Sequence, residues 1–171
     1  SLSNSAGKVA LRAKHGIPAD KLILIFPGTV RKGFRSLSPE LERALLKSNI
    51  FLLKVGRGHK AINDAINCRV VSGFIDQNEF EELVAAADYS IIPSEFYLTS
   101  AVARTSIGLR VPVIAPDYGS VVDMCLGCMV DIKAISGHDE NLDGLIPSPT
   151  SEEYLEFTDE CIKRHSERVW D

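Results

Sequence analysis

The sequence lacks several features that mark particular classes of protein. No apolar run approaches the ~20 residues that a membrane-spanning helix needs, and Leu22–Phe26 is typical of the runs that are present. The net charge of −4 offers no basic excess for a nucleic-acid partner. We therefore expect a cytoplasmic protein that has no transmembrane segment and binds no nucleic acid.

Cysteine is also scarce, with four residues, of which Cys125 and Cys128 alone lie close together in the sequence. A zinc site would need a second pair or histidines at ligand spacing, and a redox pair normally opens a helix after a strand. We expect ordinary half-buried thiols and no metal site.

The composition is that of an ordinary globular protein. Hydrophobic residues make up 45% and charged residues 25% of 171 residues, which is enough for one domain to bury a core without disulfides. The chain begins at Ser1 rather than at a methionine. We expect a single domain over residues 1–171 that has been cut from a longer protein.

Short apolar runs alternate with amphipathic segments along the chain. Runs that end near glycine or proline predict strands at residues 22–26, 51–55, 70–71, 89–92 and 111–114. Helices lie between them, and the segment 131–149 is predicted to be irregular. This alternation predicts an α/β fold with a doubly wound, mostly parallel, Rossmann-like sheet.

Capping patterns predict where the helices begin and end. Ser38 before a proline and Asp76 before a glutamate each predict a helix start, and Thr99 or Ser100 predicts another, which we expect to end in a left-handed turn at Gly108. A capping box that begins at Thr150 predicts a last helix that reaches about residue 168.

Two loops that follow predicted strands have anion-binding features. Ligands of open parallel sheets bind beyond the carboxyl ends of the strands. After the first strand, Gly28 precedes Arg31 and Lys32, which suit a diphosphate, although a solvated basic turn has the same composition. After the fourth, Thr99 and Ser100 either bind an anion together with the helix N-terminus or only cap the helix.

The loops also contain one histidine and lack one nucleotide-binding motif. His59 follows a Gly-Arg-Gly segment and is either a ligand contact or a solvated loop residue. No Gly-x-Gly-x-x-Gly turn follows the first strand, and no acidic residue lies ~20 positions later, which argues against a dinucleotide such as NAD.

The order of these motifs resembles the C-terminal domain of retaining, GT-B-fold glycosyltransferases of the glycogen-synthase and sucrose-synthase type. The similar segments are residues 16–18, 22–28, 31–33, 54–58, 70–74, 82–88, 93–94 and 112–119. The resemblance implies one half of an enzyme that uses a UDP- or GDP-linked sugar, with no cofactor or metal. An N-terminal acceptor domain would be missing from this chain, which alone would be inactive. That domain would be a partner and a route to peripheral attachment at the inner face of the membrane.

The resemblance also assigns roles to residues. Those implied in binding the donor diphosphate are Gly28, Arg31, Lys32, Leu98, Thr99 and Ser100. Those implied near the nucleobase are Phe74 and Ile75.

The chain departs from the family pattern at positions that matter for chemistry. Counted from Pro93, the two glutamates of the family fall on Tyr97 and Thr105. In the family the first lies beside the donor sugar and the second binds the ribose. Glu95 is a displaced carboxylate that can replace the first, so Glu95 and Tyr97 are the catalytic candidates and Thr105 is the ribose candidate. Arg110 stands where the family usually has glycine.

Three functions are compatible with this pattern. The leading hypothesis is a glycosyltransferase whose donor site lies in this chain. The alternative is a non-catalytic nucleotide-sugar-binding module that kept the fold and lost the glutamates. A third is another Rossmann-like binder, such as a dinucleotide enzyme or a GT-B epimerase.

Overall fold

The chain folds around one parallel sheet. The computed structural model describes residues 5–30, 37–60, 66–93, 101–117, 119–138 and 141–167. Within them the strands are β1 (Leu22–Pro27), β2 (Ile50–Val55), β3 (Cys68–Val71), β4 (Tyr89–Ile91), β5 (Val113–Ala115) and β6 (Met129–Asp131). Their order is β3-β2-β1-β4-β5-β6, and every neighbouring pair is parallel. The predicted Rossmann-like fold is confirmed, and the order of the strands reverses between β1 and β4.

The central strands are apolar because both faces of the sheet are covered. In β1 and β2, Ile23, Ile25 and Leu53 pack on one side, while Leu24 and Leu52 pack on the other, and all five are fully buried. Parallel strands buried on both faces have continuous apolar sequences rather than alternating ones. The exception is Lys54, a charged residue buried near the end of β2.

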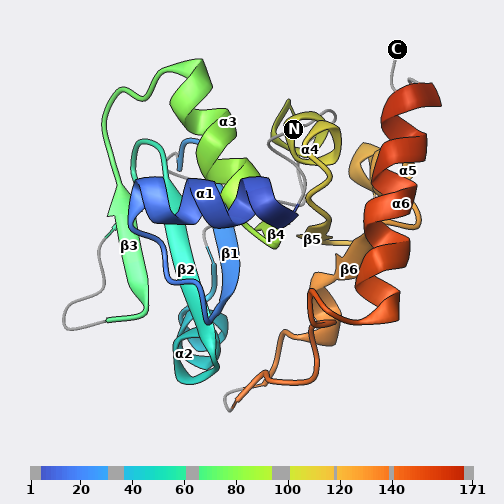
Figure 1. The fold of residues 1–171 in the computed structure, drawn as a ribbon. Coiled ribbons are helices and arrows are strands. Elements are labelled where there is room, and N and C mark those ends of the chain that lie inside the picture. Colours follow the sequence, from blue (N-terminus) through green and yellow to red (C-terminus); the bar gives the residue numbers. More distant parts are fainter. Residues whose placement is uncertain are drawn as a thin grey trace.

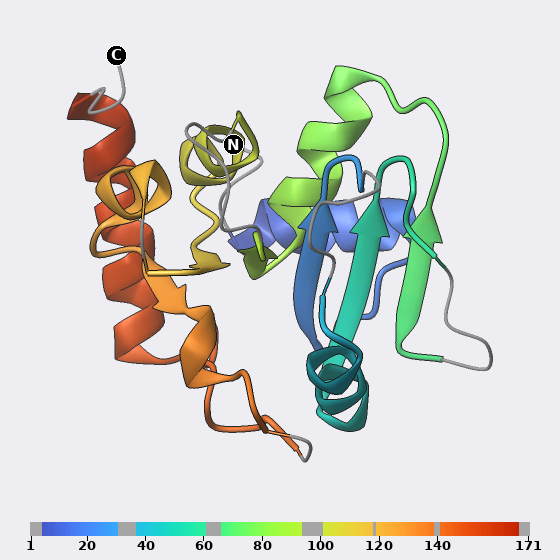
Figure 2. The ribbon, with the colours of Figure 1, turned by 180° about the vertical axis from the view of Figure 1, so that it is seen from behind.

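Helices cover both faces of the sheet (Figures 1 and 2). The helices are α1 (Ser5–His15), α2 (Pro39–Lys47), α3 (Gln77–Ala86), α4 (Ala101–Gly108), α5 (Ser120–Cys125) and α6 (Glu152–Glu167), with a 3₁₀ turn at Ile132–Ala134. The first face carries α1 and α3 beside α4, α5 and α6. The opposite face carries α2 and the segment that includes Ile135, Leu142 and Ile146.

The predicted starts of two helices are confirmed, and that of a third is wrong by one residue. The Ser38 hydroxyl accepts from Leu41 N at 3.2 Å, and the Asp76 carboxylate accepts from Glu79 N at 2.9 Å. In α6 the cap is Ser151 rather than Thr150, because the Ser151 hydroxyl accepts from the N–H of Tyr154.

Helices α1 and α5 and strand β6 were not predicted from the sequence. The contacts that hold α1 join residues far apart in the sequence: Arg12 donates to the Asp88 carboxylate at 2.8 Å, and Lys8 donates to the Ala87 carbonyl at 2.6 Å. Such long-range contacts leave no local periodicity to detect. The segment predicted to be irregular begins as β6 ends at Asp131, and it includes the 3₁₀ turn.

The predicted left-handed turn at Gly108 is wrong. Gly108 is the last residue of α4, and Arg110 adopts the left-handed conformation with φ = 60°. The N–H of Val111 donates to the Ser106 carbonyl at 2.8 Å, and the N–H of Arg110 donates to the Ile107 carbonyl at 3.0 Å. This is a Schellman motif with arginine where glycine is usual.

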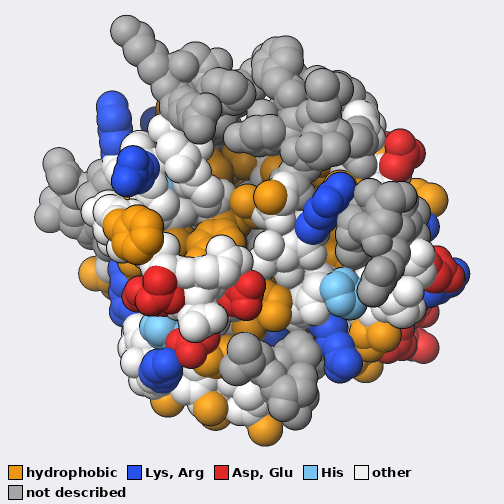
Figure 3. Space-filling view, turned by 90° about the horizontal axis from the view of Figure 1, so that it is seen from above, with side chains coloured by type: hydrophobic (Ala, Val, Ile, Leu, Met, Phe, Trp, Pro, Cys, Tyr) orange, Lys and Arg blue, Asp and Glu red, His pale blue; other side chains and the backbone are white. Residues whose placement is uncertain are grey.

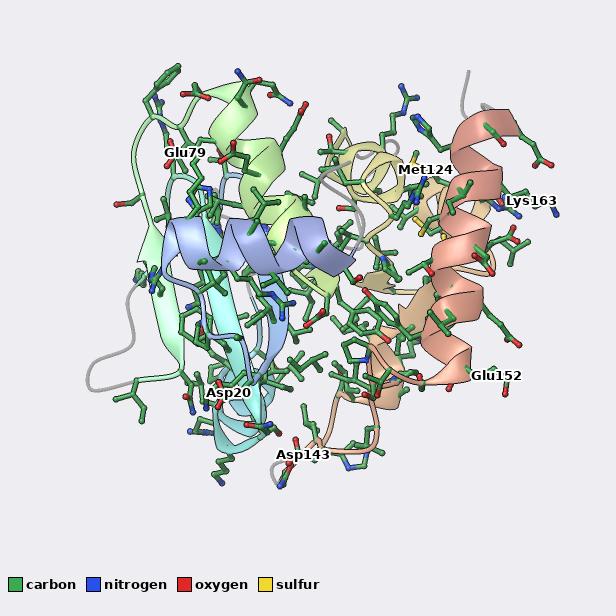
Figure 4. All side chains as sticks on the ribbon, viewed as in Figure 1. Asp20, Glu79, Met124, Asp143, Glu152 and Lys163 are labelled. Carbon is green, nitrogen blue, oxygen red and sulfur yellow. The ribbon has the colours of Figure 1, made fainter. Side chains whose placement is uncertain are left out.

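The cysteine pair is more buried than expected. Cys125, Cys128 and Cys161 have no exposed surface, and the Cys128 thiol donates to the Cys125 carbonyl at 3.2 Å. Figure 4 shows sulfur atoms gathered close to Met124, between α5 and α6. These thiols belong to an apolar cluster with Met124, so they serve as core residues. In the described part of the chain, no helix is long and apolar enough to cross a membrane.

Candidate functional site

A hollow of about 480 Å³ lies at the carboxyl ends of β1, β2 and β3. Its lining includes Gly28, Gly56, Arg57, Gly73, Phe74 and Ile75. Figure 3 looks onto this end of the molecule, where hydrophobic side chains show in the recesses and both acidic and basic side chains surround them. This is the edge at which open α/β sheets bind ligands, beside the reversal of strand order at β1.

Beside the hollow, the loop after β1 and the loop after β2 pack backbone against backbone. The N–H of Gly28 donates to the Val55 carbonyl at 2.9 Å, and the N–H of Val30 donates to the Arg57 carbonyl at 2.8 Å. A Cβ on Gly58 would lie 2.1 Å from the Val30 oxygen. No side chain fits in that space, so glycine is required for the loops after β1 and β2 to pack against each other.

Two residues that line the hollow, Phe74 and Arg57, suit a planar, polar ligand. The Phe74 side chain is 87% exposed, and no described atom lies within 4 Å of the Cβ position of Gly73. Arg57, which is exposed, also lines the hollow and carries a guanidinium. Aromatic rings and guanidinium groups both stack on planar bases. The structure thus brings Gly28, Phe74 and Ile75, three of the predicted site residues, to one hollow.

Most other predicted site residues cannot be placed. Those that lie outside the described residues are Arg31, Lys32, Glu95, Tyr97, Leu98, Thr99 and Ser100. The first turn of α4 nevertheless approaches the loop after β1, because a Cβ on Gly28 would lie 3.6 Å from Cγ2 of Val102. The start of α4 therefore lies beside Gly28 at this edge of the sheet.

Thr105 lies on α4, half-buried, and its hydroxyl donates to the Ala101 carbonyl at 3.0 Å. It is not among the described residues that line the 480 Å³ hollow. The hydroxyl that α4 buries is that of Ser106, which donates to the Ser90 hydroxyl at 2.7 Å. Position 105 is thus not the one that packs against the sheet.

A buried polar group behind the loops was not predicted. Lys54, whose side chain is 8% exposed, forms an ion pair with Glu42 and donates to the Lys60 carbonyl at 3.0 Å. With Phe26 and His59, these residues line a second hollow of about 190 Å³. The lysine near the end of an otherwise apolar strand was the available signal.

His59 is half-buried, and its ring packs between the Gly28 carbonyl and Phe26. Its Nε2 lies 2.8 Å from the Gly28 carbonyl oxygen, and its ring meets the Phe26 ring edge-on, with centroids 4.7 Å apart. Burial lowers the pKa of His59 below its ordinary value, and the charge of Lys54 lowers it further. The neutral ring has one N–H, and the contact with a carbonyl places that proton on Nε2.

A third hollow, of about 540 Å³, lies at the opposite edge of the sheet and is lined in part by Asp20 and Asp143. Figure 4 shows these two residues at the lower end, away from Glu79 at the start of α3. The Asp143 carboxylate accepts from Asn49 N at 2.9 Å and thereby holds its loop against the end of α2. We therefore take the hollow at the carboxyl ends as the candidate site.

Known proteins that are similar to this chain include glycosyltransferases. No protein-family model matches the chain. The chain is 28% identical over 120 residues to TuaC of Bacillus subtilis (strain 168), which is named as a glycosyltransferase of teichuronic acid biosynthesis. The match covers 69% of this chain and 30% of TuaC.

Solved structures with the same fold include glycosyltransferases. Anabaena HepE, solved with UDP-glucose, matches with a TM-score of 0.65 and 15% identity over 95% of this chain and 48% of HepE. WaaG, a glycosyltransferase involved in lipopolysaccharide biosynthesis, matches with a TM-score of 0.67 and 20% identity over 95% of this chain and 47% of WaaG. The chain thus spans about half the length of these structures. The resemblance to GT-B glycosyltransferases is confirmed at the level of the fold.

Proposed function

We propose that this chain is the donor-binding domain of a glycosyltransferase that transfers a sugar from a UDP- or GDP-linked donor. The observation that carries the proposal is the 480 Å³ hollow beside the strand-order reversal, in a fold shared with about half of HepE, which was solved with UDP-glucose. About half of HepE and of WaaG lies outside the match, which leaves room for a second domain in each. A corresponding acceptor domain would complete a cleft over this edge of the sheet.

In this proposal, the nucleobase lies against Phe74 and Ile75 and the diphosphate lies toward Gly28. Arg31 and Lys32 neutralise the diphosphate, and the backbone at residues 98–100 donates to it. Thr105 meets the ribose. No metal or other cofactor takes part, and leaving-group charge is stabilised by preorganised donors. We place the enzyme in the cytoplasm, attached to the inner face of the membrane through its other domain.

The second candidate is a nucleotide-sugar-binding module without catalysis. It is favoured by Tyr97 and Thr105, which occupy the two positions where the resembling enzymes have glutamates. Glu95 is the remaining carboxylate of that loop. Both candidates bind the donor, so the full-length protein must be assayed to separate them: sugar transfer that is lost in Glu95→Gln supports catalysis, and donor binding without transfer supports the module.

Donor binding is tested by calorimetry of the chain with UDP, GDP and uridine. We expect weak binding of a nucleoside diphosphate, because one wall of the cleft belongs to another domain. Arg31→Ala and Lys32→Ala should each weaken diphosphate binding by about 1–3 kcal/mol and change uridine binding far less.

The matched control is Arg43→Ala, which removes an exposed cation of α2 that pairs with Glu40 at 3.8 Å. It should bind UDP as the parent does. Absence of heat and of amide shifts at millimolar UDP and GDP would refute the donor site. Unchanged binding in both loop variants would show that residues 31 and 32 form an ordinary solvated turn.

A further inference from the structure

The Gly28 carbonyl oxygen lies close to both His59 and Gly56. His59 Nε2 lies 2.8 Å from it. A Cβ on Gly56 would lie 2.4 Å from the same oxygen, so only glycine at position 56 leaves room for it there. The oxygen therefore points toward His59, which is not among the residues that line the 480 Å³ hollow.

The direction of this oxygen fixes the direction of the next N–H. The Gly28 carbonyl and the Thr29 N–H belong to one peptide unit, and in a trans peptide the C=O and N–H bonds point in opposite directions. The structure contains no cis peptide among its described residues. Because the oxygen points toward His59, the Thr29 N–H points away from His59, and Gly28 and Thr29 both line the 480 Å³ hollow, which His59 does not.

The backbone N–H groups on either side of Thr29 already donate hydrogen bonds within the protein, whereas the N–H of Thr29 does not donate to any described residue. The N–H of Gly28 donates to Val55 and that of Val30 donates to Arg57. No described residue accepts a hydrogen bond from the N–H of Thr29. A backbone donor on a loop fixed from both sides is preorganised, so it loses little entropy when it meets an anion.

We propose that His59 is a positioning residue that, through the Gly28 carbonyl, aims the Thr29 N–H at the diphosphate of the bound nucleotide. This inference rests on the proposed function and deepens it by adding a backbone donor to the diphosphate site. The ring also packs edge-on against Phe26, so loss of the hydrogen bond and loss of the packing must be separated by experiment.

Two variants make that separation. His59→Phe keeps an aromatic ring beside Phe26 and has no N–H to donate, whereas His59→Gln loses the ring and keeps a side-chain amide donor near the position of Nε2. We expect His59→Phe to weaken UDP binding roughly 3- to 10-fold, the effect of one net hydrogen bond. His59→Gln should bind UDP within about 2-fold of the parent. Uridine, which has no phosphate, should bind all three proteins equally.

Amide NMR of the 171-residue chain provides a readout that folding alone does not move. Titration with UDP should shift the Thr29 amide in the parent and in His59→Gln, and should shift it much less in His59→Phe. Inorganic pyrophosphate should do the same, which tests the anion donor without the nucleoside.

The outcomes separate this inference from the proposed function. If UDP and GDP do not bind but pyrophosphate shifts the Thr29 amide in a His59-dependent way, the donor assignment fails and the positioning role stands. If UDP binds but the Thr29 amide does not move, or His59→Phe binds UDP as the parent does, the positioning role is wrong. Should His59→Phe not fold, an unmoved Thr29 amide in the parent would still overturn it.

Discussion

The two halves of the sheet, β1–β3 and β4–β6, differ in how closely they follow the glycosyltransferase pattern. The first half has strands of six, six and four residues, and glycines let its loops pack backbone against backbone. The second half has strands of three residues, and it carries Thr105 and Arg110 where the resembling enzymes have glutamate and glycine. Under the proposed function, the first half would hold the base, and the second half would supply ribose binding, where the resemblance implies a glutamate in place of Thr105.

The largest effect is expected at the glycine contacts of the first half. Gly58→Ala should lower the free energy of unfolding by several kcal/mol, because the new Cβ would lie 2.1 Å from the Val30 oxygen and φ is +82°. Chemical denaturation monitored by circular dichroism measures the loss.

The control for Gly58→Ala is Gly137→Ala. Its φ of +81° is nearly the same, and no described atom lies within 4 Å of its Cβ position. It should lose only the ~1–2 kcal/mol of a left-handed alanine. Equal losses in the two variants would mean that the close packing of the loops contributes nothing.

The next effect concerns the ion pair behind those loops. Glu42→Gln should destabilise the domain by about 2 kcal/mol, because it leaves the Lys54 ammonium, 8% exposed, without its counter-charge. The double variant Glu42→Gln/Lys54→Met should recover most of the loss, since it removes the uncompensated charge. Thermal denaturation of the single and double variants measures the coupling, and additive losses would contradict it.

Local features of the fold could be predicted from the sequence, and long-range contacts could not. The caps at Ser38 and Asp76 involve an N–H three residues away, so their patterns are visible in a short window. The contact between Arg12 and Asp88 spans 76 residues, and α1 was missed with it. An off-by-one error arose at Thr150, where Ser151 competes for the same role.

The candidate site divides in the same way. Gly28, Phe74 and Ile75 follow strands, and the topology of a parallel sheet is enough to bring them to one edge. The bond between His59 and Gly28 spans 31 residues and depends on where two loops pack, which no motif encodes. Arg110 was noticed as a departure, but its left-handed conformation depends on the Schellman hydrogen bonds that end α4.

A stabilising change is expected in the second half of the sheet. Arg110→Gly should raise the free energy of unfolding by roughly 0.5–1 kcal/mol, because relief of a left-handed non-glycine residue exceeds the added entropy of a glycine in the unfolded chain. The melting temperature should rise by a few degrees in a domain of this size.

Two variants test whether the backbone is the cause. Arg110→Ala removes the charge and keeps the Cβ, so its stability should equal that of the parent. Gly16→Ala makes the opposite change at the end of α1, where Gly16 has φ = 64° and Ile17 N donates to the Arg12 carbonyl, and it should be destabilising. A gain in Arg110→Ala as large as that in Arg110→Gly would assign the effect to charge instead.

A smaller effect is the pH dependence contributed by His59. Its pKa in the folded protein is lowered by burial, and the groups that face it are Lys54, Glu42 and the carbonyls of Gly28 and Val55. The unfolded chain takes up the proton first, so this contribution to stability is complete above about pH 6.5 and falls as the pH drops below that value. The loss of stability between pH 7.5 and 5 should be smaller in His59→Gln than in the parent. An equal or larger loss of stability in the variant would contradict a lowered pKa of His59 in the folded protein.

The smallest change in stability is expected for Thr105→Glu, which restores the family's residue in the second half of the sheet. Thr105 is half-buried on α4, and among the described residues its hydroxyl donates only to the Ala101 carbonyl. Because glutamate is also a good helix former, the free energy of unfolding should change by no more than about 0.5 kcal/mol. Ser106→Glu is the matched control: Ser106 is fully buried, and a carboxylate there should be strongly destabilising.

If position 105 meets the ribose, the new carboxylate of Thr105→Glu accepts from both ribose hydroxyls, so calorimetry should show tighter UDP binding and a greater preference for UDP over deoxy-UDP. Unchanged stability with no gain in ribose preference would mean that this face of α4 points away from the nucleotide, and that the ribose is bound by another residue.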